Sequence, residues 1–495
     1  MILFLNHLNA QNFKNIDYGQ IFLGNNSSGT GMFGNSVSDA GDFNGDGFSD
    51  IIVGSYFFNP NGAAYIFFGG NSLDAIPDIF LTTQDNAFGF GSCVSTVGDV
   101  NNDGFDDVIV NSSEKSYLYF GNNIGDNLVD IVFNEETTSI SGAGDVNNDG
   151  YDDIIIGNEN YNISTGIVYI YYGGANMDNS IDLILNSEGS GDTFGNSVSS
   201  AGDFNNDGFD DVVVGFFSNN DLAGKANLYL GGTTMNTVSD LSFVGEPVVG
   251  RMEFLVSDGG DINNDDYDDI IIGGVLSYDN QGIAYVLFGG SSLNNTADLE
   301  LYENDAEESF GSSLSSAGDI NNDGFDDIIV GADYHNNMFG RAYIYFGGTA
   351  PDNISDKIID SNSESFFGCS VSGCGDINDD GIDDLIIGAE GYNDYNGQCY
   401  IYLGDSNLDI VSDLNLSGFG DGAGFGNSVS GGDINNDGFN DIVIGSYYYD
   451  NQKGKVEIYF GGINIENIPD LIISENDTYR YPKSFIWINP DTFVS

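Results

Sequence analysis

Positive charge is scarce in this 495-residue chain: 10 Lys and Arg residues stand against 77 Asp and Glu, which gives a formal net charge of −67. A surface this negative repels phosphate backbones and anionic lipid headgroups, so the sequence predicts no binding to nucleic acid. A basic or cationic partner is the better expectation. A solvated acidic surface or adaptation to salt would explain the charge if the acidic residues were scattered, but they recur in a fixed pattern.

Histidine and long apolar runs are also rare. The two histidines, His7 and His335, lie near no Ser or Cys nucleophile at motif spacing, so the sequence predicts no enzyme. No apolar run approaches the ~18 residues that cross a bilayer, so no direct membrane insertion is expected. The apolar stretch at residues 1–5 is interrupted by Asn6 and is preceded by no basic residue. Residues 1–16 are therefore interpreted as an N-terminal tail or a residual signal segment.

The four cysteines do not identify a functional site. They make no zinc-site spacing, and Cys374 takes the place of Ala201 in the repeat described below, which indicates a small buried residue. A bridge between Cys374 and Cys399 and unpaired core thiols both remain open. All four are expected in strands: Cys93, Cys369, Cys374 and Cys399.

Glycine, by contrast, is abundant, with 70 residues, and it punctuates an internal repeat. One nine-residue pattern occurs eight times, at intervals of 46 to 58 residues. Such a period is typical of solenoids, arrays and propellers. The eight copies begin at Asp42, Asp99, Asp145, Asp203, Asp261, Asp319, Asp376 and Asp433.

The repeat unit is illustrated by residues 194–244. Short strands are predicted at 196–201, 212–214, 226–230 and 240–244, with a tight loop at 203–211. Four strands per unit are typical of a propeller blade. The sequence therefore predicts an all-β fold, a single β-propeller of four-stranded blades with eight repeats, and seven blades plus one appended repeat as the alternative.

The second strand of each unit is apolar at consecutive positions, as in Ile51-Ile52-Val53 and Ile270-Ile271-Ile272. Strands covered on both faces need not alternate, and blades stacked face to face cover their central strands in this way. The recurring Tyr and Phe of the third strand, as in 340–347, are interpreted as blade packing rather than as a ligand platform.

The nine-residue loop reads Asp-x-Asn-x-Asp-Gly-aromatic-x-Asp and is predicted to bind Ca²⁺, with up to eight ions in the chain. Calcium takes six to eight oxygen ligands, and positions 1, 3, 5 and 9 supply carboxylate and amide oxygens while position 7 can supply its backbone carbonyl. The glycine at position 6 permits a positive φ. The predicted ligands are Asp42, Asn44, Asp46, Asp50, Asp99, Asn101, Asp103, Asp107, Asp145, Asn147, Asp149, Asp153, Asp203, Asn205, Asp207, Asp211, Asp261, Asn263, Asp265, Asp269, Asp319, Asn321, Asp323, Asp327, Asp376, Asn378, Asp380, Asp384, Asp433, Asn435, Asp437 and Asp441.

Three other interpretations of the loop fit the residues less well. An EF-hand needs a Glu at position 12, but that position is apolar here, as at Val214. Magnesium keeps more water than so many protein oxygens would allow. A metal-free Asx-rich turn fits any single copy, but eight copies with three crowded carboxylates each favour the metal. Asp266 replaces the position-6 glycine, so the loop at 261–269 is expected to be the weakest site.

The repeats resemble the FG-GAP repeats of the integrin α-subunit N-terminal β-propeller. A Phe-Gly pair precedes the first strand in six repeats, and the calcium loops and the Gly-x-Ala-Tyr-Ile-Tyr-Phe-Gly third strand complete the likeness. The two other repeats have Glu136-Thr137 and Phe254-Leu255. The six pairs are Phe33-Gly34, Phe90-Gly91, Phe194-Gly195, Phe310-Gly311, Phe367-Gly368 and Phe425-Gly426.

The resemblance covers about residues 17–476, and the domain is placed at 17–478, with a C-terminal tail at 479–495. Integrin propellers have seven blades, and integrin subunits continue into leg domains and a membrane span, so the chain looks like a free-standing relative of the head module. Residues 17–23 also resemble a fourth strand and compete with 470–473 for the edge of the last blade.

The function that the resemblance implies is that of an extracellular or cell-surface, calcium-binding adhesion module with a protein or glycan ligand. The recognition surface is expected opposite the calcium loops, at residues such as 56–62, 334–340 and 392–397. A carbohydrate-binding protein or a structural surface-layer protein is the alternative, and a non-catalytic accessory propeller of an enzyme such as a hydrolase is a further one. Glycosylation sequons at Asn111, Asn162 and Asn353 agree with an exterior location but also occur by chance in so Asn-rich a chain.

Overall fold

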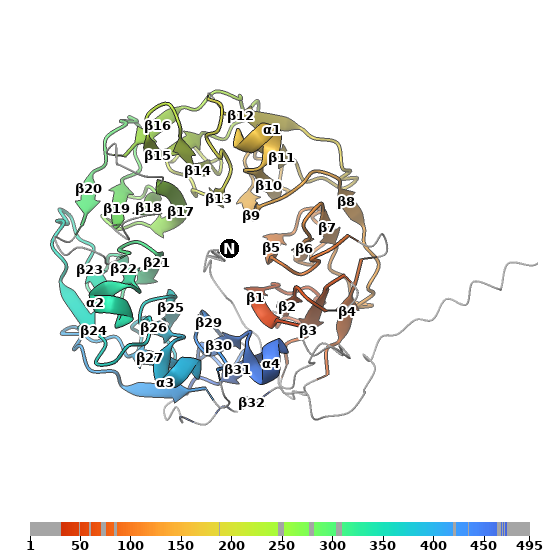
Figure 1. The fold of residues 1–495 in the computed structure, drawn as a ribbon. Coiled ribbons are helices and arrows are strands. Elements are labelled where there is room, and N and C mark those ends of the chain that lie inside the picture. The colour runs from red at the N-terminus through yellow and green to blue at the C-terminus, as the bar shows by residue number, and fades with distance from the viewer. Residues whose placement is uncertain are drawn as a thin grey trace, which may run out of the picture.

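The computed structural model describes residues 31–472 except 49, 59–60, 71–75, 84–86, 188, 246–251, 277–281, 303–308, 419–421, 434, 463–466, 468 and 470. This part of the chain forms eight four-stranded antiparallel sheets, arranged as blades round a central axis (Figure 1). The prediction of an all-β, eight-bladed propeller is confirmed, and the alternative of seven blades with an appended repeat is wrong.

Each blade uses four strands that are consecutive in the chain, the first nearest the axis and the fourth at the rim (Figure 1). Blades 1 to 4 contain β1 (Phe33–Asp39), β2 (Ile51–Ser55), β3 (Ala63–Phe67) and β4 (Ile79–Leu81); β5 (Val94–Gly98), β6 (Asp107–Asn111), β7 (Ser116–Tyr119) and β8 (Ile131–Phe133); β9 (Ser139–Gly144), β10 (Asp153–Asn158), β11 (Ile167–Tyr171) and β12 (Leu183–Asn186); β13 (Ser197–Ser200), β14 (Val212–Ser218), β15 (Ala223–Tyr229) and β16 (Leu241–Val244).

Blades 5 to 8 repeat the same order. They contain β17 (Met252–Gly260), β18 (Asp269–Leu276), β19 (Gly282–Leu287) and β20 (Leu299–Leu301); β21 (Ser313–Gly318), β22 (Asp327–Ala332), β23 (Arg341–Tyr345) and β24 (Lys357–Asp360); β25 (Val371–Gly375), β26 (Asp384–Ala389), β27 (Gln398–Tyr402) and β28 (Leu414–Ser417); β29 (Ser428–Gly432), β30 (Asp441–Ser446), β31 (Lys455–Tyr459) and β32 (Leu471–Ile472).

The hydrophobic core is divided into eight clusters, each lying between two neighbouring blades. Consecutive residues of a second strand point into different clusters: Ile51 and Val53 face blade 8, whereas Ile52 faces blade 2. A strand that is buried on both faces needs an apolar residue at every position, which explains the uninterrupted Ile and Val runs. The aromatic third-strand residues are buried in the same clusters, so their interpretation as packing is confirmed; Tyr65 and Tyr343 are examples.

The ring closes through the same contact that joins other blades. Phe33 of blade 1 bridges Gly454 of blade 8, just as Phe194 bridges Gly166. Blade 8 supplies its own fourth strand, since β32 pairs with β31. The competing strand expected at 17–23 lies outside the described residues.

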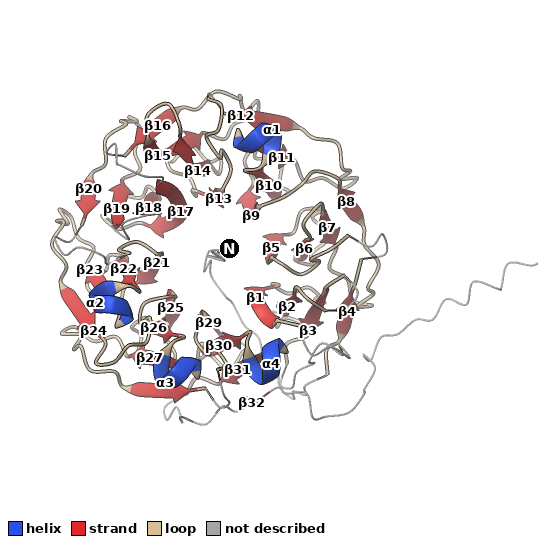
Figure 2. Cartoon of the chain, viewed as in Figure 1, coloured by secondary structure: helices blue, strands red, loops and turns tan. Residues whose placement is uncertain are grey.

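Four blades turn from their second to their third strand through one helical turn: α1 (Tyr161–Ser164), α2 (His335–Met338), α3 (Tyr392–Tyr395) and α4 (Tyr449–Gln452) (Figure 2). Several residues in these turns have positive φ, among them Asn336 and Asn393. Asn and Asp tolerate this left-handed conformation better than other non-glycine residues, which explains why the turns are rich in them. None of the described helices has the length and apolar character needed to cross a membrane.

Two expectations about single residues need correction. Cys93 and Cys369 lie just before strands rather than in them, while Cys374 and Cys399 do lie in strands, and all four thiols are free. The bridge between Cys374 and Cys399 is therefore not formed, although both residues pack in the cluster between blades 7 and 8. Asn111 is only 4% exposed and donates its side-chain amide to the Thr137 carbonyl, so this sequon is inaccessible in the folded chain.

Candidate metal-binding loops and the opposite face

Each of the eight loops connects the first strand of a blade to its second, so all eight open on one side of the ring. Position 6 has positive φ in every copy, including Asp266 at 69° in place of glycine. Position 4 is also left-handed throughout, which the sequence analysis did not identify; Asn102 and Asn206 are examples. An Asn, Asp or Gly at this position is the signal that could have revealed it.

The position-1 aspartate organises the loop from inside. One of its carboxylate oxygens accepts the backbone N–H of position 5 and the other accepts that of position 6, at 2.7–3.1 Å in all eight copies. Loop 5 keeps this pattern, with Asp265 and Asp266 donating to Asp261. The position-5 carboxylate accepts the N–H of position 7 in a similar way, as Asp103 does from Phe105. These bonds hold the carboxylates of positions 1 and 5 on the same small turn.

The position-9 aspartate is fully buried at the base of the loop. One oxygen accepts the N–H of a glycine two residues beyond the end of the third strand, at 2.6–2.8 Å in all eight blades. In five loops the other oxygen accepts the N–H of position 2, as Asp107 does from Val100. The pKa of Asp107 is raised to about 8; burial is the largest cause, and the neighbouring carboxylates of Asp103 and Asp99 contribute to the same rise.

The same crowding recurs in other loops. Burial is the main cause that raises the pKa of Asp153, Asp211, Asp269 and Asp327 to about 8, and the carboxylates of positions 1 and 5 of each loop add to the rise. Like charges held this close to a buried carboxylate disfavour its ionised form unless a cation is present.

The donor set fits a hard cation. A carboxylate has about four acceptor sites, so a position-1 or position-9 aspartate that receives two N–H groups can still bind a metal. Two predicted ligand atoms, Oδ2 of Asp211 and Oδ1 of Asn435, are buried without a hydrogen-bond partner. Among the described residues, however, no three Asp, Glu, His or Cys side chains are already grouped as a metal site requires. The 32 ligands therefore stay a prediction.

Sequence reasoning missed three structural positions of the loop. Position 2, rather than the half-buried position 7, carries the fully buried anchor, as Val100 and Ile320 do. Position 8 reaches across to the preceding blade, and the glycine before position 1 makes room for it. Asp recurs at position 8 in six copies, which marks the position as constrained but does not identify the residue that it contacts.

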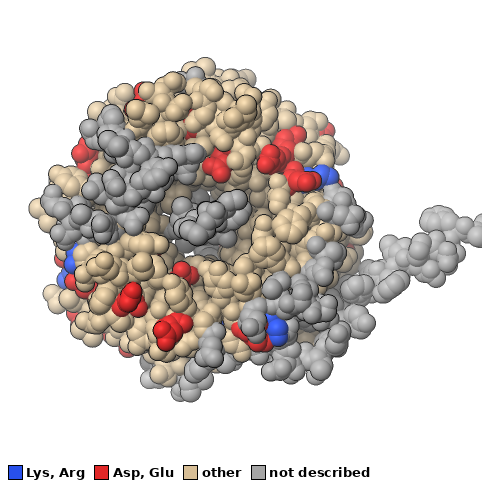
Figure 3. All heavy atoms as spheres, in the orientation of Figure 1, with Lys and Arg blue, Asp and Glu red and all other residues tan. Residues whose placement is uncertain are grey.

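The opposite side of the ring, where α1 to α4 lie, presents aromatic residues. In one cluster Tyr56, Phe57 and Phe88 have ring centroids 4.4 to 6.1 Å apart, and Phe57 and Phe88 are 37% and 49% exposed. Tyr56 and Phe57 follow the second strand of blade 1, and Phe88 lies in the segment that joins blade 1 to blade 2. On this face acidic side chains form separate patches on a mostly uncharged surface (Figure 3).

A second aromatic cluster joins blades 6 and 7. Phe366 lies 5.4 Å from Tyr334 and 5.9 Å from Tyr395, measured between ring centroids, and Tyr395 is 50% exposed. Two of the three segments expected to form the recognition surface, 334–340 and 392–397, therefore contribute to this cluster. The third segment, 56–62, contributes to the cluster of blades 1 and 2.

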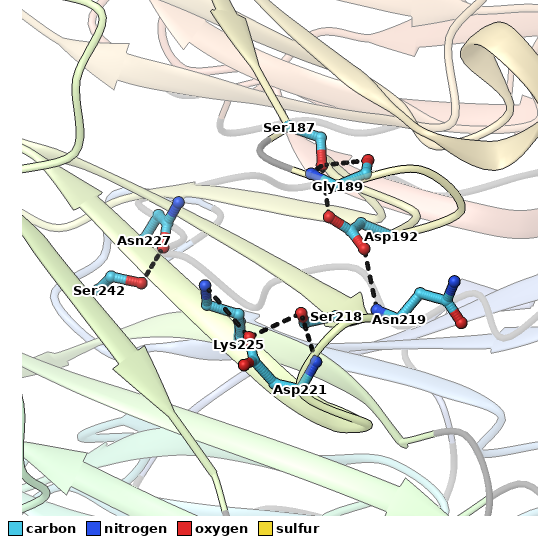
Figure 4. A network of polar contacts seen from close by, with 9 residues as sticks. All are labelled: Ser187, Gly189, Asp192, Ser218, Asn219, Asp221, Lys225, Asn227 and Ser242. Atoms are coloured by element: carbon cyan, nitrogen blue, oxygen red, sulfur yellow. Dashed lines mark hydrogen bonds and ion pairs between the residues drawn. The ribbon is translucent and has the colours of Figure 1, made fainter.

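A polar network fixes the same face between blades 3 and 4 (Figure 4). Asp192 is 2% exposed, and its carboxylate accepts the Ser187 hydroxyl at 2.7 Å and the Asn219 N–H at 2.9 Å. Ser218 donates to Asp221, whose carboxylate lies 3.6 Å from the Lys225 ammonium. Blade 4 thus uses a bonded hairpin where blades 3, 6, 7 and 8 use a helical turn, so the backbone of this face differs from blade to blade.

Comparison with known proteins matches the FG-GAP repeat at six segments: residues 33–67, 137–171, 194–223, 310–345, 367–402 and 425–459. The matched segments lie in blades 1, 3, 4, 6, 7 and 8. Blade 3 matches although it lacks the Phe-Gly pair, and blade 2 is not matched although it has Phe90-Gly91. FG-GAP propellers often bind Ca²⁺.

Three curated relatives are integrin α subunits. Integrin alpha-5 of Xenopus laevis is 32% identical over 45% of this chain and 22% of its own length. Integrin alpha-2 of Mus musculus is 38% identical over 26% of this chain and 12% of its own length. Integrin alpha-V of Gallus gallus is 31% identical over 38% of this chain and 19% of its own length. The chain therefore spans less than a quarter of each of these relatives.

Among solved structures, Sqt1 of Chaetomium thermophilum has a TM-score of 0.53 and covers 86% of this chain and 94% of its own, at 11% identity. So low an identity supports the fold alone. The chain carries FG-GAP repeats and is distantly similar to integrin α subunits over part of its length.

Proposed function

We propose that this chain is a calcium-binding propeller that recognises a protein or glycan ligand outside the cell. The observation that carries the calcium half is the crowding of three carboxylates in each loop, at positions 1, 5 and 9. In two of the loops a predicted ligand atom, Oδ2 of Asp211 or Oδ1 of Asn435, is also buried without a hydrogen-bond partner. Seen in one loop, such an arrangement would suit a turn. The arrangement is repeated eight times in a chain with a net charge of −67, so bound cations are needed to offset the repulsion between the carboxylates.

In each loop the side chains of positions 1, 3, 5 and 9 and the carbonyl of position 7 would hold the ion. Calcium, when bound, supplies the positive charge that the crowded carboxylates lack. The chain's own contribution is geometric: the backbone bonds to positions 1 and 5 fix the turn, and the bonds to position 9 fix its base. Because the position-5 residues, such as Asp46 and Asp323, are exposed, the loops are open to solvent.

An exterior location fits these open loops. Open calcium sites of extracellular modules bind at roughly 10⁻⁴ to 10⁻³ M, which exceeds the concentration in resting cytosol. The distant similarity to integrin α subunits points the same way. Free thiols alone do not argue against it, since Cys374 and Cys399 are buried and inert.

Ligand recognition is placed on the face of α1 to α4, at the two aromatic clusters. Exposed aromatic rings offer large contact area at little entropic cost, and they are enriched in protein interfaces. The cluster of Tyr56, Phe57 and Phe88 would serve equally for a sugar ring, so carbohydrate binding is the second candidate. We propose no catalytic role for this chain.

Isothermal calorimetry of the full chain tests the calcium half. Calcium titrated into chelator-treated protein should release heat at several sites, with magnesium binding far more weakly because it keeps its water. Absence of calcium heat would refute the proposal. For the ligand half, arrays of oligosaccharides and of extracellular proteins should each be probed with and without calcium. Binding on the oligosaccharide array would indicate a glycan ligand, and binding on the protein array a protein ligand. Calcium-induced light scattering without either ligand would instead favour a self-assembling surface layer.

A further inference from the structure

Position 8 of the loop forms a bond between blades. In six junctions its aspartate carboxylate accepts the backbone N–H of position 1 in the preceding loop, at 2.7–3.0 Å. Asp210 of blade 4, for example, accepts the N–H of Asp145 in blade 3 at 2.7 Å. The six aspartates are Asp106, Asp152, Asp210, Asp268, Asp326 and Asp383.

The contact holds position 1 from two sides. At three of these junctions the N–H of position 8 also donates to the carbonyl of position 1, as Asp210 does to Asp145 at 3.4 Å. The glycine before position 1 has positive φ, and a Cβ there would lie 2.1 to 2.3 Å from the aspartate carboxylate, as at Gly144 and Gly202. The sequence therefore keeps a Gly-Asp pair at the loop start because the neighbouring blade occupies the space beside it.

A second link runs in the same direction. The side-chain amide of the position-4 asparagine donates to the position-6 carbonyl of the next loop at 2.6–2.7 Å in four junctions. Asn148, for example, donates to Gly208. Each of these four junctions thus ties two loops together through both position 4 and position 8.

The two junctions of blade 8 differ. Asn440 stands at position 8 between blades 7 and 8, and its N–H donates to the Asp376 carbonyl at 2.9 Å, but it has no carboxylate. Between blades 8 and 1 the position-8 residue is Ser49, which is outside the described residues, and the asparagine link from Asn436 to Gly47 is longer, at 3.3 Å. The hydrogen bond from the position-1 N–H of one loop to the position-8 carboxylate of the next is called the clasp below. It occurs at the six junctions between loop 1 and loop 7.

We propose that the position-8 aspartates are positioning residues that couple neighbouring loops. Calcium binding is then cooperative from loop 1 to loop 7. This inference rests on the proposed calcium function. Position 8 is adjacent in sequence to the ligand at position 9, so an ion held by Asp211 also fixes Asp210. Asp210 in turn fixes the backbone of Asp145, the first ligand of loop 3. The conformational entropy lost when calcium orders one loop is then not lost again when its neighbour binds calcium. The two calcium-binding events are therefore positively coupled.

Amide hydrogen exchange of the full chain, followed by mass spectrometry across calcium concentration, tests the coupling loop by loop. In the variant Asp210→Ala, the calcium concentration that half-protects residues 145–153 should rise about tenfold, since a hydrogen bond to a charged acceptor is lost. Residues 376–384 should keep their midpoint. The charge-matched control Asp178→Ala removes an exposed carboxylate of blade 3 and should move neither.

The reverse variant, Asn440→Asp, adds the missing clasp and should lower the midpoint of residues 376–384 while steepening their transition. It does not remove any native bond that folding needs, so it decides the question if Asp210→Ala fails to fold. Unchanged midpoints in these variants would overturn the coupling. If no loop of the unmodified chain gains protection with calcium, the proposed calcium function itself fails, which is a different result.

Discussion

The two faces of the ring differ in how strictly they repeat. On the loop face, the same hydrogen bonds to positions 1 and 9 recur in all eight blades at nearly the same distances. On the opposite face, four blades use a helical turn, blade 4 uses a hairpin pinned by Asp192, and aromatic clusters occur at only some junctions.

This difference separates what maintains the ring from what could distinguish one partner from another. A repeated element has to satisfy the same physical requirement in every copy, here the packing and electrostatics between blades. An element that varies between blades over the same scaffold is free to carry specificity, as loops on rigid scaffolds commonly do.

The largest effect should follow removal of calcium from the loop face. Each loop that binds only in the folded state adds about 2.7 kcal/mol at a free calcium concentration of 100 times its Kd, and several loops add together. Thermal melting of the full chain in chelator and in calcium at 100 times the Kd found by calorimetry should therefore differ by more than any single substitution can produce. An equal concentration of magnesium is the control. Identical melting in chelator and calcium would mean that the loops act as metal-free turns.

The next largest effect concerns the buried layer of the opposite face. Phe90 is fully buried between blades 1 and 2, so Phe90→Ala should lower the free energy of unfolding by about 3–5 kcal/mol. Phe90→Leu retains most of the volume and should cost less than about 1.5 kcal/mol. Urea denaturation in saturating calcium measures both. Equal losses for the two variants would show that the aromatic ring, rather than its volume, is required.

A smaller effect tests the close approach on the loop face. Gly202 and Gly208 both have positive φ, at 59° and 88°, but a Cβ would lie 2.1 Å from the Asp268 carboxylate at Gly202, whereas at Gly208 it would make only an ordinary contact with Nδ2 of Asn148 at 3.9 Å. Gly208→Ala should therefore cost only the backbone strain of about 1–2 kcal/mol. Gly202→Ala should cost more, because the clasp between blades 4 and 5 must also open. If chemical denaturation gives equal losses, the aspartate is easily displaced.

Most of the fold could be predicted from the sequence, because the repeat presents similar evidence eight times. The consecutive apolar residues at Ile51 to Val53 predict a strand buried on both faces, and the structure confirms it. Blade number also followed from counting loops. A polar turn after the second strand was predicted, but its left-handed conformation was not, because a turn such as Asn336-Asn337 depends on a few local dihedral angles rather than on periodicity.

The candidate site was predicted in part. Ligand types and spacing could be read from one loop, but the role of position 8 could not. Asp210 and Asp211 are adjacent carboxylates of the same chemical type, and only the placement of the neighbouring blade distinguishes a residue that reaches outward from one that is buried. Contacts of this kind, between residues 65 positions apart, are invisible to a local pattern.

The smallest effect on stability, and the sharpest test of the two faces, is expected for the exposed aromatic residues. Phe88 is 49% exposed and lies two residues from the buried Phe90, so Phe88→Ala should change the free energy of unfolding by no more than about 0.5 kcal/mol. The same variant, alone and with Phe57→Ala, should lose binding on the oligosaccharide and protein arrays. Ile354→Ala removes a comparably exposed apolar residue outside the cluster and should retain binding. A loss of stability at Phe88 approaching that at Phe90 would assign the whole cluster to the core and leave this face without a recognition surface there.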